Sequence, residues 1–248
     1  MNRIRFLFKK WALITVVSVY SLANDAYSQT KPSPQKSIIS EKIAVLKYQD
    51  HLDTLELPVV SDKYPALKKA LSYKNIFNGD DLPDLIKNYA DCECGITSFG
   101  YQVTFESKDV ISIKIYVETT AAYPDDSEEW FTLNIATGEP YPISREINAK
   151  GLRWLFESYK AELRKRVYEY KSENPDEDIA AYNELKAAID SLHSDELFGK
   201  YVFTKQGIAL SIEKILPHAL QNMEPDRDLM VPYDKLKIYI APGALIIK

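Results

Sequence analysis

Apolar and polar residues alternate at every second position in the middle of the chain, between residues 99 and 135. This period is typical of β-strands that bury one face. The turn ESKD separates two alternating runs, and EEWFTLNI continues as a third strand up to the turn ATGE. The residues on the inward face of the first two runs are Phe99, Tyr101, Val103, Phe105, Ile111, Ile113, Ile115 and Val117. We therefore predict an antiparallel meander of three strands with one buried face.

On both sides of this meander, apolar residues recur every three to four positions, which predicts helices. SDKYPALKKALS predicts a short helix with Asp62 as its cap and Pro65 in its first turn, and NGDDLPDLIKNYA predicts another. From Asn148 a longer apolar stripe predicts a helix of about five to six turns, and residues 179–192 predict one of about four turns. The two long helices would form an αα-hairpin.

Shorter apolar runs predict strands nearer the two ends of the chain. TLELPVV predicts a strand over residues 54–60, and KYVFTKQGIALSI predicts two strands joined by a turn that contains glycine. LMVPYDKL predicts a short strand that leads into a turn of helix. The predicted fold class is α+β, with an antiparallel sheet (the meander plus the C-terminal strands) packed against the αα-hairpin and the short N-terminal helices.

Composition divides the chain into a leader over residues 1–28, a flexible tether over residues 29–41 and a single domain over residues 42–248. The tether begins QTKPSPQKS and is rich in Lys, Ser and Pro without a period, which is typical of a linker. The expected parts of the domain are an N-terminal part (42–148), the helical hairpin (149–193) and a C-terminal part (194–248).

The leader has the layout of a bacterial secretory signal peptide. Four basic residues precede an apolar run from Trp11 to Ala23, which is shorter than the roughly 20 residues that span a bilayer. Ala26 and Ser28 have the spacing of a cleavage site, and no cysteine lies near residue 28 to carry a lipid anchor. We expect cleavage near Ser28 and a periplasmic or secreted protein without a stable membrane span. A leader retained as an anchor is the alternative.

Net charge narrows the choice of partners. The 248 residues include 31 basic and 36 acidic ones, for a formal charge of −5. The leader holds four of the basic residues and one of the acidic ones, so its removal changes the formal charge to −8. Nucleic acids and anionic membrane surfaces attract basic proteins, so this charge argues against both as partners.

Cys92 and Cys94 are the two cysteines of the chain, and a single residue separates them. In an extended strand their Cβ atoms would lie about 7 Å apart, whereas a disulfide needs about 3.8 Å, so a bond within the pair requires a tight turn. A metal site needs two more ligands, and the spacing of His51, His193 and His218 indicates none. We expect free thiols, with a local disulfide as the alternative and no metal site.

Three pairs of adjacent carboxylates are candidates for acid–base chemistry or for calcium binding. They are Asp80 with Asp81, Asp125 with Asp126, and Glu128 with Glu129. Neighbouring residues of an extended segment point to opposite faces, so helix capping and solvated loop charge are the favoured interpretation. The sequence contains no motif of a serine hydrolase, of a zinc protease or of a phosphate-binding loop. We therefore assign no catalytic residue, metal ligand or cofactor.

Aromatic residues are abundant, with 17 tyrosines in the chain. Those predicted to lie on the two long helices are Tyr159, Tyr168, Tyr170 and Tyr182. Tyrosine combines a rigid apolar ring with a polar tip and contributes strongly to binding interfaces. The favoured interpretation is that most of these rings line the core, and a role in an interface is the alternative.

Several of these stretches resemble one bacterial family. YQVTFES, VISIKIYVET, AAYP and WFTLNIATGEPYPI resemble, in this order, the pattern of extracytoplasmic domains related to the RsiV anti-sigma factor. FTKQGIALSI and LMVPYDKLKIYI are similar to C-terminal elements of that family, which is known as domain of unknown function 3298, and TLELPVVSDKYPALKKAL is similar to its companion N-terminal segment. The resemblance extends over residues 42–248, and its motifs are signatures of strands and turns.

The resemblance implies an α+β domain with a binding or sensing role, because RsiV-type domains recognise a protein ligand, lysozyme, outside the membrane. In this chain we expect no cytoplasmic anti-sigma segment. EKILPHALQNMEP replaces the family's aromatic-rich stretch and keeps only Pro217 and Ala219, with His218 between them. A ligand surface formed there would differ from that of the family.

The leading hypothesis is an exported, non-enzymatic domain that recognises an extracytoplasmic protein or a cell-wall glycan. Its candidate ligand surface consists of Tyr123, Asp125, Asp126, Glu128 and His218. The alternatives are a hydrolase of envelope polymers with an acidic site at the same three carboxylates, and a structural protein of the envelope.

Overall fold

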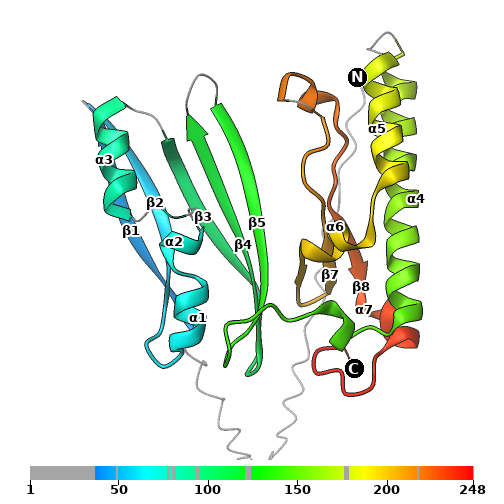
Figure 1. Cartoon of the computed structure of the whole chain (residues 1–248), viewed down its shortest axis with the longest axis horizontal. Helices are drawn as coiled ribbons and strands as arrows, with labels where there is room; N and C mark the ends of the chain where they lie inside the picture. Colours follow the sequence, from blue (N-terminus) through cyan, green and yellow to red (C-terminus); the bar gives the residue numbers. More distant parts are fainter. Residues whose placement is uncertain are drawn as a thin grey trace, which may run out of the picture. The chain divides into compact units, whose positions relative to one another are not determined.

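The chain folds into two β-sheets with helices packed against them (Figure 1). The structure is a computed structural model. It describes residues 37–248 except 49, 77, 78, 80, 81, 93, 94, 121–123, 176–178, 217 and 248. Residues 37–248 belong to one compact unit. The predicted leader and most of the predicted tether lie outside the described residues, as does Cys94.

The first sheet has five strands in the order β1-β2-β3-β4-β5. Neighbouring strands are antiparallel except β2 and β3, which run parallel and pair at Leu55 and Phe99. The strands are β1 (Ile39–Tyr48), β2 (His51–Val60), β3 (Gly95–Glu106), β4 (Val110–Thr120) and β5 (Pro124–Asn134). The predicted meander is thus confirmed as β3, β4 and β5, and the predicted strand over 54–60 is the second half of β2.

Strand β1 was not predicted. It begins at Ile39, inside the stretch expected to be a tether up to residue 41, and it pairs with β2 along its whole length. Ile38 and Ile39 are buried, so the domain begins earlier than composition indicated. Lys, Ser and Pro characterise the preceding residues, but burial of two isoleucines favours a strand once β2 is available as a partner.

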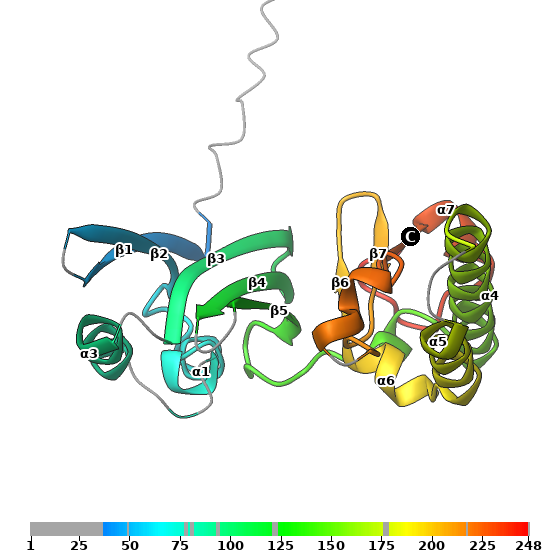
Figure 2. The same ribbon diagram turned by 90° about the horizontal axis from the view of Figure 1, so that it is seen from above.

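Short helices cover one face of this sheet (Figure 2). They are α1 (Pro65–Ala70), α2 (Tyr73–Ile76) and α3 (Leu82–Cys92). α3 packs against β1 and β3, and α1 packs against β2. Tyr89 of α3 and Leu67 of α1 are fully buried in the resulting core. A glycine is required at the turn after β5, because Gly138 has φ +70° and a Cβ there would lie 2.5 Å from the carbonyl oxygen of Ala66.

The predicted cap of the first short helix was wrong. Tyr64 occupies the N-cap position of α1 and no side chain caps the helix. Asp62 instead forms an ion pair with Lys68, with 2.6 Å between Oδ1 and Nζ. Pro65 lies in the first turn, as predicted.

The second half of the chain contains the long helices and the second sheet. α4 (Ala149–Glu173) is capped by Asn148, whose side chain accepts a hydrogen bond from the N–H of Gly151. α4 and α5 (Ile179–Ser191) pack against each other as the predicted αα-hairpin (Figure 1). Of the tyrosines on these helices, Tyr159 is fully buried and Tyr168 is largely exposed. Among the described residues, no helix is both long enough and apolar enough to cross a membrane.

The second sheet has three antiparallel strands in the order β6-β7-β8. They are β6 (Tyr201–Phe203), β7 (Gly207–Leu210) and β8 (Leu229–Pro232). The remaining helices are α6 (Ser194–Gly199), α7 (Tyr233–Leu236) and the 3-10 helices η1 (Ile143–Arg145), η2 (His218–Met223) and η3 (Lys237–Tyr239). The α+β class is therefore confirmed, but the C-terminal strands form a sheet of their own.

The expectation of a single buried face for the meander was wrong near the start of β4. Val110, Ile111 and Ser112 are all buried, although they alternate between the two faces. The reason is that β6 packs on the face opposite the short helices. Ser112 Oγ accepts a hydrogen bond from the N–H of Phe203 (3.1 Å), and Thr132 Oγ1 donates to the carbonyl of Tyr201 (3.0 Å). Hydroxyl groups on a buried face therefore find their partners in the backbone of β6.

The C-terminal tail is held by a buried carboxylate. Glu146 has no exposed surface, and it accepts hydrogen bonds from the N–H groups of Leu245, Ile246 and Ile247 at 2.9 to 3.0 Å. It also accepts one from the hydroxyl of Tyr141 at 2.6 Å. Burial of a charge is costly unless hydrogen bonds compensate for it, and here four donors do so.

Candidate functional site

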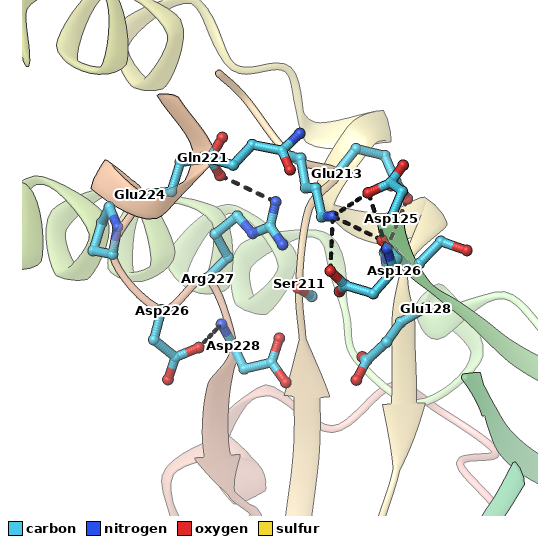
Figure 3. A pocket seen from close by; sticks show the side chains of 14 residues that line it. Asp125, Asp126, Glu128, Ser211, Glu213, Gln221, Glu224, Asp226, Arg227 and Asp228 are labelled. Carbon is cyan, nitrogen blue, oxygen red and sulfur yellow. Dashed lines mark hydrogen bonds and ion pairs between the residues drawn. The ribbon is translucent and has the colours of Figure 1, made fainter. Parts of the chain in front are cut away.

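A cavity of about 540 Å³ opens beside the first half of β5. Its walls come from three segments that are distant in the sequence: β5, the stretch 211–216 that follows β7, and the stretch 221–228 that precedes β8. Figure 3 shows carboxylates from all three segments turned toward this space. They are Asp125, Asp126, Glu128, Glu213, Glu224, Asp226 and Asp228.

Lys214 joins two of the walls. Its Nζ lies 3.0 Å from Oδ1 of Asp125 and 3.3 Å from Oδ1 of Asp126, and it donates to the carbonyl of Asp126 at 2.7 Å. Burial lowers the pKa of Lys214, but the hydrogen bonds with Asp125 and Asp126 outweigh this and raise the pKa above its ordinary value. Lys214 therefore stays charged, and the two neighbouring aspartates of β5 serve as its ion-pair partners.

Glu224 and Arg227 shape the wall formed by residues 221–228. The Glu224 side chain is only 5% exposed and lies 3.1 Å from Nη1 of Arg227. Its other oxygen accepts hydrogen bonds from the backbone N–H groups of Ile215 (2.7 Å) and Leu216. Because one carboxylate binds both the stretch after β7 and the arginine, it holds these two segments of the cavity together.

Helix α4 supports the same wall from behind. Arg166 donates from Nη1 to the carbonyls of Asp226 (2.7 Å) and Asp228 (2.9 Å). Tyr159 donates its hydroxyl to the carbonyl of Arg227 at 2.6 Å. The backbone of residues 226–228 is thus fixed by a long helix. The same Arg166 Nη1 also lies 3.6 Å from Oδ2 of Asp226, so that carboxylate has an ion-pair partner behind the cavity.

Strand β4 contributes a cation, Lys114, that pairs with two acids of the lining. Lys114 Nζ lies 3.5 Å from the centre of the Trp130 ring, 3.3 Å from Asp228 Oδ2 and 4.0 Å from Glu128 Oε2. Trp130 Nε1 donates to Glu128 at 2.7 Å. The Lys114 side chain is 13% exposed, so it acts as a fixed link between the first sheet and the segment before β8.

Negative charge dominates the lining of the cavity. Seven carboxylates and three cationic side chains belong to the lining, and Lys114 and Arg166 pair with Asp228 and Asp226 from outside it, so carboxylates outnumber cations by two. The cations are Lys200, Lys214 and Arg227, and each is paired with an acid of the same lining. Clefts lined by one sign of charge focus the field and attract ligands of the opposite sign. This cavity is therefore suited to a cationic group.

Three of the candidate residues meet in this cavity: Asp125, Asp126 and Glu128. Tyr123 lies outside the described residues, and His218 belongs to η2, but its side chain is outside the described part of the structure. Cys92 ends α3, and the structure describes neither its side chain nor Cys94, so the state of the thiols stays a prediction.

Sequence reasoning missed the residues that complete the cavity, above all Lys214, Glu224, Arg227 and Asp228. The charged stretch MEPDRD was a local signal, but nothing in it indicated contact with β5, which lies roughly a hundred residues earlier in the chain. Sequence reasoning also offered calcium binding as an alternative for the paired acids. Among the described residues, no group of three or more histidine, cysteine or acidic side chains is arranged to hold a metal ion.

Comparison with solved structures shows which known fold the chain resembles. No family model matches the chain, and no curated protein matches it. The crystal structure of a DUF3298 family protein from Pseudomonas aeruginosa PAO1 is similar, with a TM-score of 0.52 over 83% of this chain and 94% of that one. The chain has the fold of a DUF3298 family protein. The sequence identity is 10%, so the likeness concerns the fold alone.

A second similar structure is a member of the same family from Bacteroides fragilis NCTC 9343. Its TM-score is 0.42 and its identity 13%, with 83% of this chain and 93% of that chain covered. The fold shared with the Pseudomonas protein is the one that the strand-and-turn motifs implied. This likeness says nothing about an RsiV-type role.

Proposed function

We propose that this chain is an exported binding domain that recognises an extracytoplasmic protein by its basic side chains, and that the acidic cavity beside β5 receives them. The observation that supports this proposal is the excess of carboxylates in the lining. Lysine and arginine side chains of a partner would form charge-assisted hydrogen bonds with these carboxylates. No catalytic role is needed for this function.

The chemistry of the lining favours a protein over the other ligands considered. Small-molecule pockets are mostly apolar, with a few polar groups that fix the orientation of the ligand, whereas this lining is mostly charged. Sugar rings stack on exposed aromatic faces, and none of the described lining residues is aromatic. A basic protein segment needs only an acidic, solvated surface, which the cavity provides.

Asp226 and Asp228 are carboxylates of the lining that can be changed with little effect on the wall, although Arg166 and Lys114 lie beside them. Their main-chain carbonyls bind Arg166, so the backbone geometry depends little on the two side chains. Asp226 Oδ1 accepts from the N–H of Asp228 at 2.9 Å, which an asparagine oxygen would do equally well. An asparagine oxygen at position 228 would also still accept the hydrogen bond that Lys114 Nζ donates to Asp228 Oδ2 (3.3 Å). Changing both residues to asparagine therefore removes two charges from the cavity and keeps these hydrogen bonds.

Binding of a labelled peptide with alternating arginine and glycine residues tests the proposal. We expect salt-sensitive binding to the wild-type chain, and about tenfold weaker binding to the D226N/D228N variant in fluorescence anisotropy. The matched control is E157Q/E184Q, which removes two exposed charges from α4 and α5 and should bind like the wild type. The same variants, used to capture proteins from periplasmic extracts, should show which basic protein depends on the cavity.

Two outcomes would contradict the proposal. The first is equal affinity of the wild type and D226N/D228N for the basic peptide. The second is hydrolysis of purified cell-wall fragments that is lost in the D125A/D126A/E128A variant, because that result would support the hydrolase alternative.

A further inference from the structure

Strand β1 forms an open edge of the five-stranded sheet (Figure 2). It is ten residues long, and its pairing with β2 runs without interruption from Ile39 to Tyr48. In the described part of the chain no strand pairs with its other side. Edge strands present unpaired backbone groups, and proteins commonly protect them with proline, bulges, short length or charged side chains. β1 is long and has no proline or bulge, and its charged residues (Glu41, Lys42 and Lys47) lie toward its two ends, away from the apolar centre.

The exposed face of β1 has a symmetric arrangement of charge and apolar surface. Its odd-numbered residues from Glu41 to Lys47 point away from the core. At the centre lie Ile43 and Val45, which are 49% and 54% exposed, and an acid and a base flank them. Two adjacent large apolar residues on an exposed edge are a feature of association surfaces rather than of solvated strands.

The backbone of the same residues faces the open edge. Ser61 donates its N–H to the carbonyl of Ile38 at 3.0 Å, so Ile38 directs its carbonyl toward β2. In an antiparallel ladder the residues alternate between those that bond to one neighbour and those that bond to the other. The odd-numbered residues of β1 therefore direct their N–H and C=O groups outward.

We propose that two copies of this chain associate through β1, antiparallel and about a twofold axis at Ala44, so that their sheets become continuous. In this register Glu41 lies opposite Lys47 of the second copy, and Ile43 lies opposite Val45. The twofold axis repeats each pair, which gives two ion pairs at the ends and an apolar centre. The smallest side chain of the central stretch lies on the axis.

The charges select this register over its neighbours. A shift by two residues would place Lys47 opposite Ile39 or Ile43, and Glu41 would lose its basic partner. A shift by one residue would bring the exposed face of one copy beside the buried face of the other. Within the described part of the chain, neither Glu41 nor Lys47 forms an ion pair, so both are free to form one with a second copy.

Charge reversal tests the register directly. Sedimentation equilibrium of the full chain should show a monomer–dimer equilibrium for the wild type. E41K and K47E should each weaken dimerisation by about tenfold, because each places like charges opposite one another at both ends. An equimolar mixture of the two variants should recover wild-type association, because every acid then faces a base. E157K, a charge reversal on the exposed face of α4, is the matched control and should leave dimerisation unchanged.

A second measurement locates the contact. Amide hydrogen exchange of residues 43 and 45 should slow as the protein concentration rises through the dimerisation range. A wild-type chain that remains monomeric at high micromolar concentration overturns the proposal. A dimer that both reversals leave unchanged, or that the mixture does not restore, also overturns it. None of these measurements involves the cavity, so their outcome is independent of the proposed ligand.

Discussion

The two ends of the first sheet differ in what covers them. At the β5 end, β6 packs against the sheet, hydroxyl groups of Ser112 and Thr132 bond to its backbone, and charged residues line a cavity. At the β1 end, Ile43 and Val45 are exposed and the backbone faces outward. The two ends therefore differ within the described part of the chain: at the β5 end polar groups have intramolecular partners, and at the β1 edge the outward backbone groups pair with no described strand.

The largest expected effect comes from the second half of the chain, which includes the strand β6 that covers the β5 end of the first sheet. E146Q replaces an acceptor oxygen with an NH₂ group in a site where three backbone N–H groups converge. At least one buried donor then loses its partner, so we expect a loss of about 3 kcal/mol in the free energy of unfolding, measured by urea denaturation. E157Q on the exposed face of α4 should change it by less than about 0.5 kcal/mol. Equal stability of both variants would show that the C-terminal tail is not held as the structure indicates.

The next largest effect should be a loss of stability at alkaline pH, because several tyrosines are buried in the second half of the chain. Burial, and then the charge of Glu146, raise the pKa of Tyr233 to about 12, and burial also raises the pKa of Tyr141, Tyr159 and Tyr201 above the ordinary value. The unfolded chain then loses protons near pH 10, before the folded one does. Stability is therefore complete below pH 10 and is lost as pH rises through 12, which circular dichroism at increasing pH can follow.

The variant Y233F isolates one part of this effect. It removes an ionisable group together with the hydrogen bond from its hydroxyl to the carbonyl of Thr204 (2.8 Å). We expect a loss of about 1 kcal/mol at pH 7 and a shallower loss of stability between pH 10 and 12 than in the wild type. An unchanged slope would contradict the assigned environment of Tyr233.

The smallest effect on the free energy of unfolding should come from a substitution in β1, at the open end of the first sheet. I43T should change the free energy of unfolding of the monomer by less than about 0.5 kcal/mol, because Ile43 is half exposed and threonine also favours strands. Urea denaturation at low protein concentration measures this change. A loss above about 2 kcal/mol would mean that the edge is covered within the monomer and would weaken the contrast between the two ends.

The local spacing of apolar residues was sufficient to predict the strands and helices that follow one clear period. The meander and the αα-hairpin were predicted because their apolar residues follow period 2 or 3.6 without interruption. β1 escaped prediction for a physical reason: the exposed Ile43 and Val45 alternate with the buried Ala44 and Leu46, so the run IAVL shows no polar face. The exposed apolar residues of β1 therefore removed the alternation by which a strand is recognised in a sequence.

The candidate site was predicted only in part for a related reason. Asp125, Asp126 and Glu128 were found because they are neighbours in the sequence. Their partners Lys214 and Lys114 come from other strands and segments, and no local signal connects a lysine to an aspartate many residues away. The pairing of charges depends on which segments the core brings together.

The sequence by itself determined the α+β class, the meander and the helical hairpin, because secondary structure follows from the spacing of apolar residues along a few turns or strand residues. Only the tertiary structure decided that β2 joins β3 in parallel, that Ser112 is buried, and that the cavity assembles beside β5. These features depend on contacts between residues far apart in the chain. Their energy comes from burial and hydrogen bonding that exist only once both partners are in place.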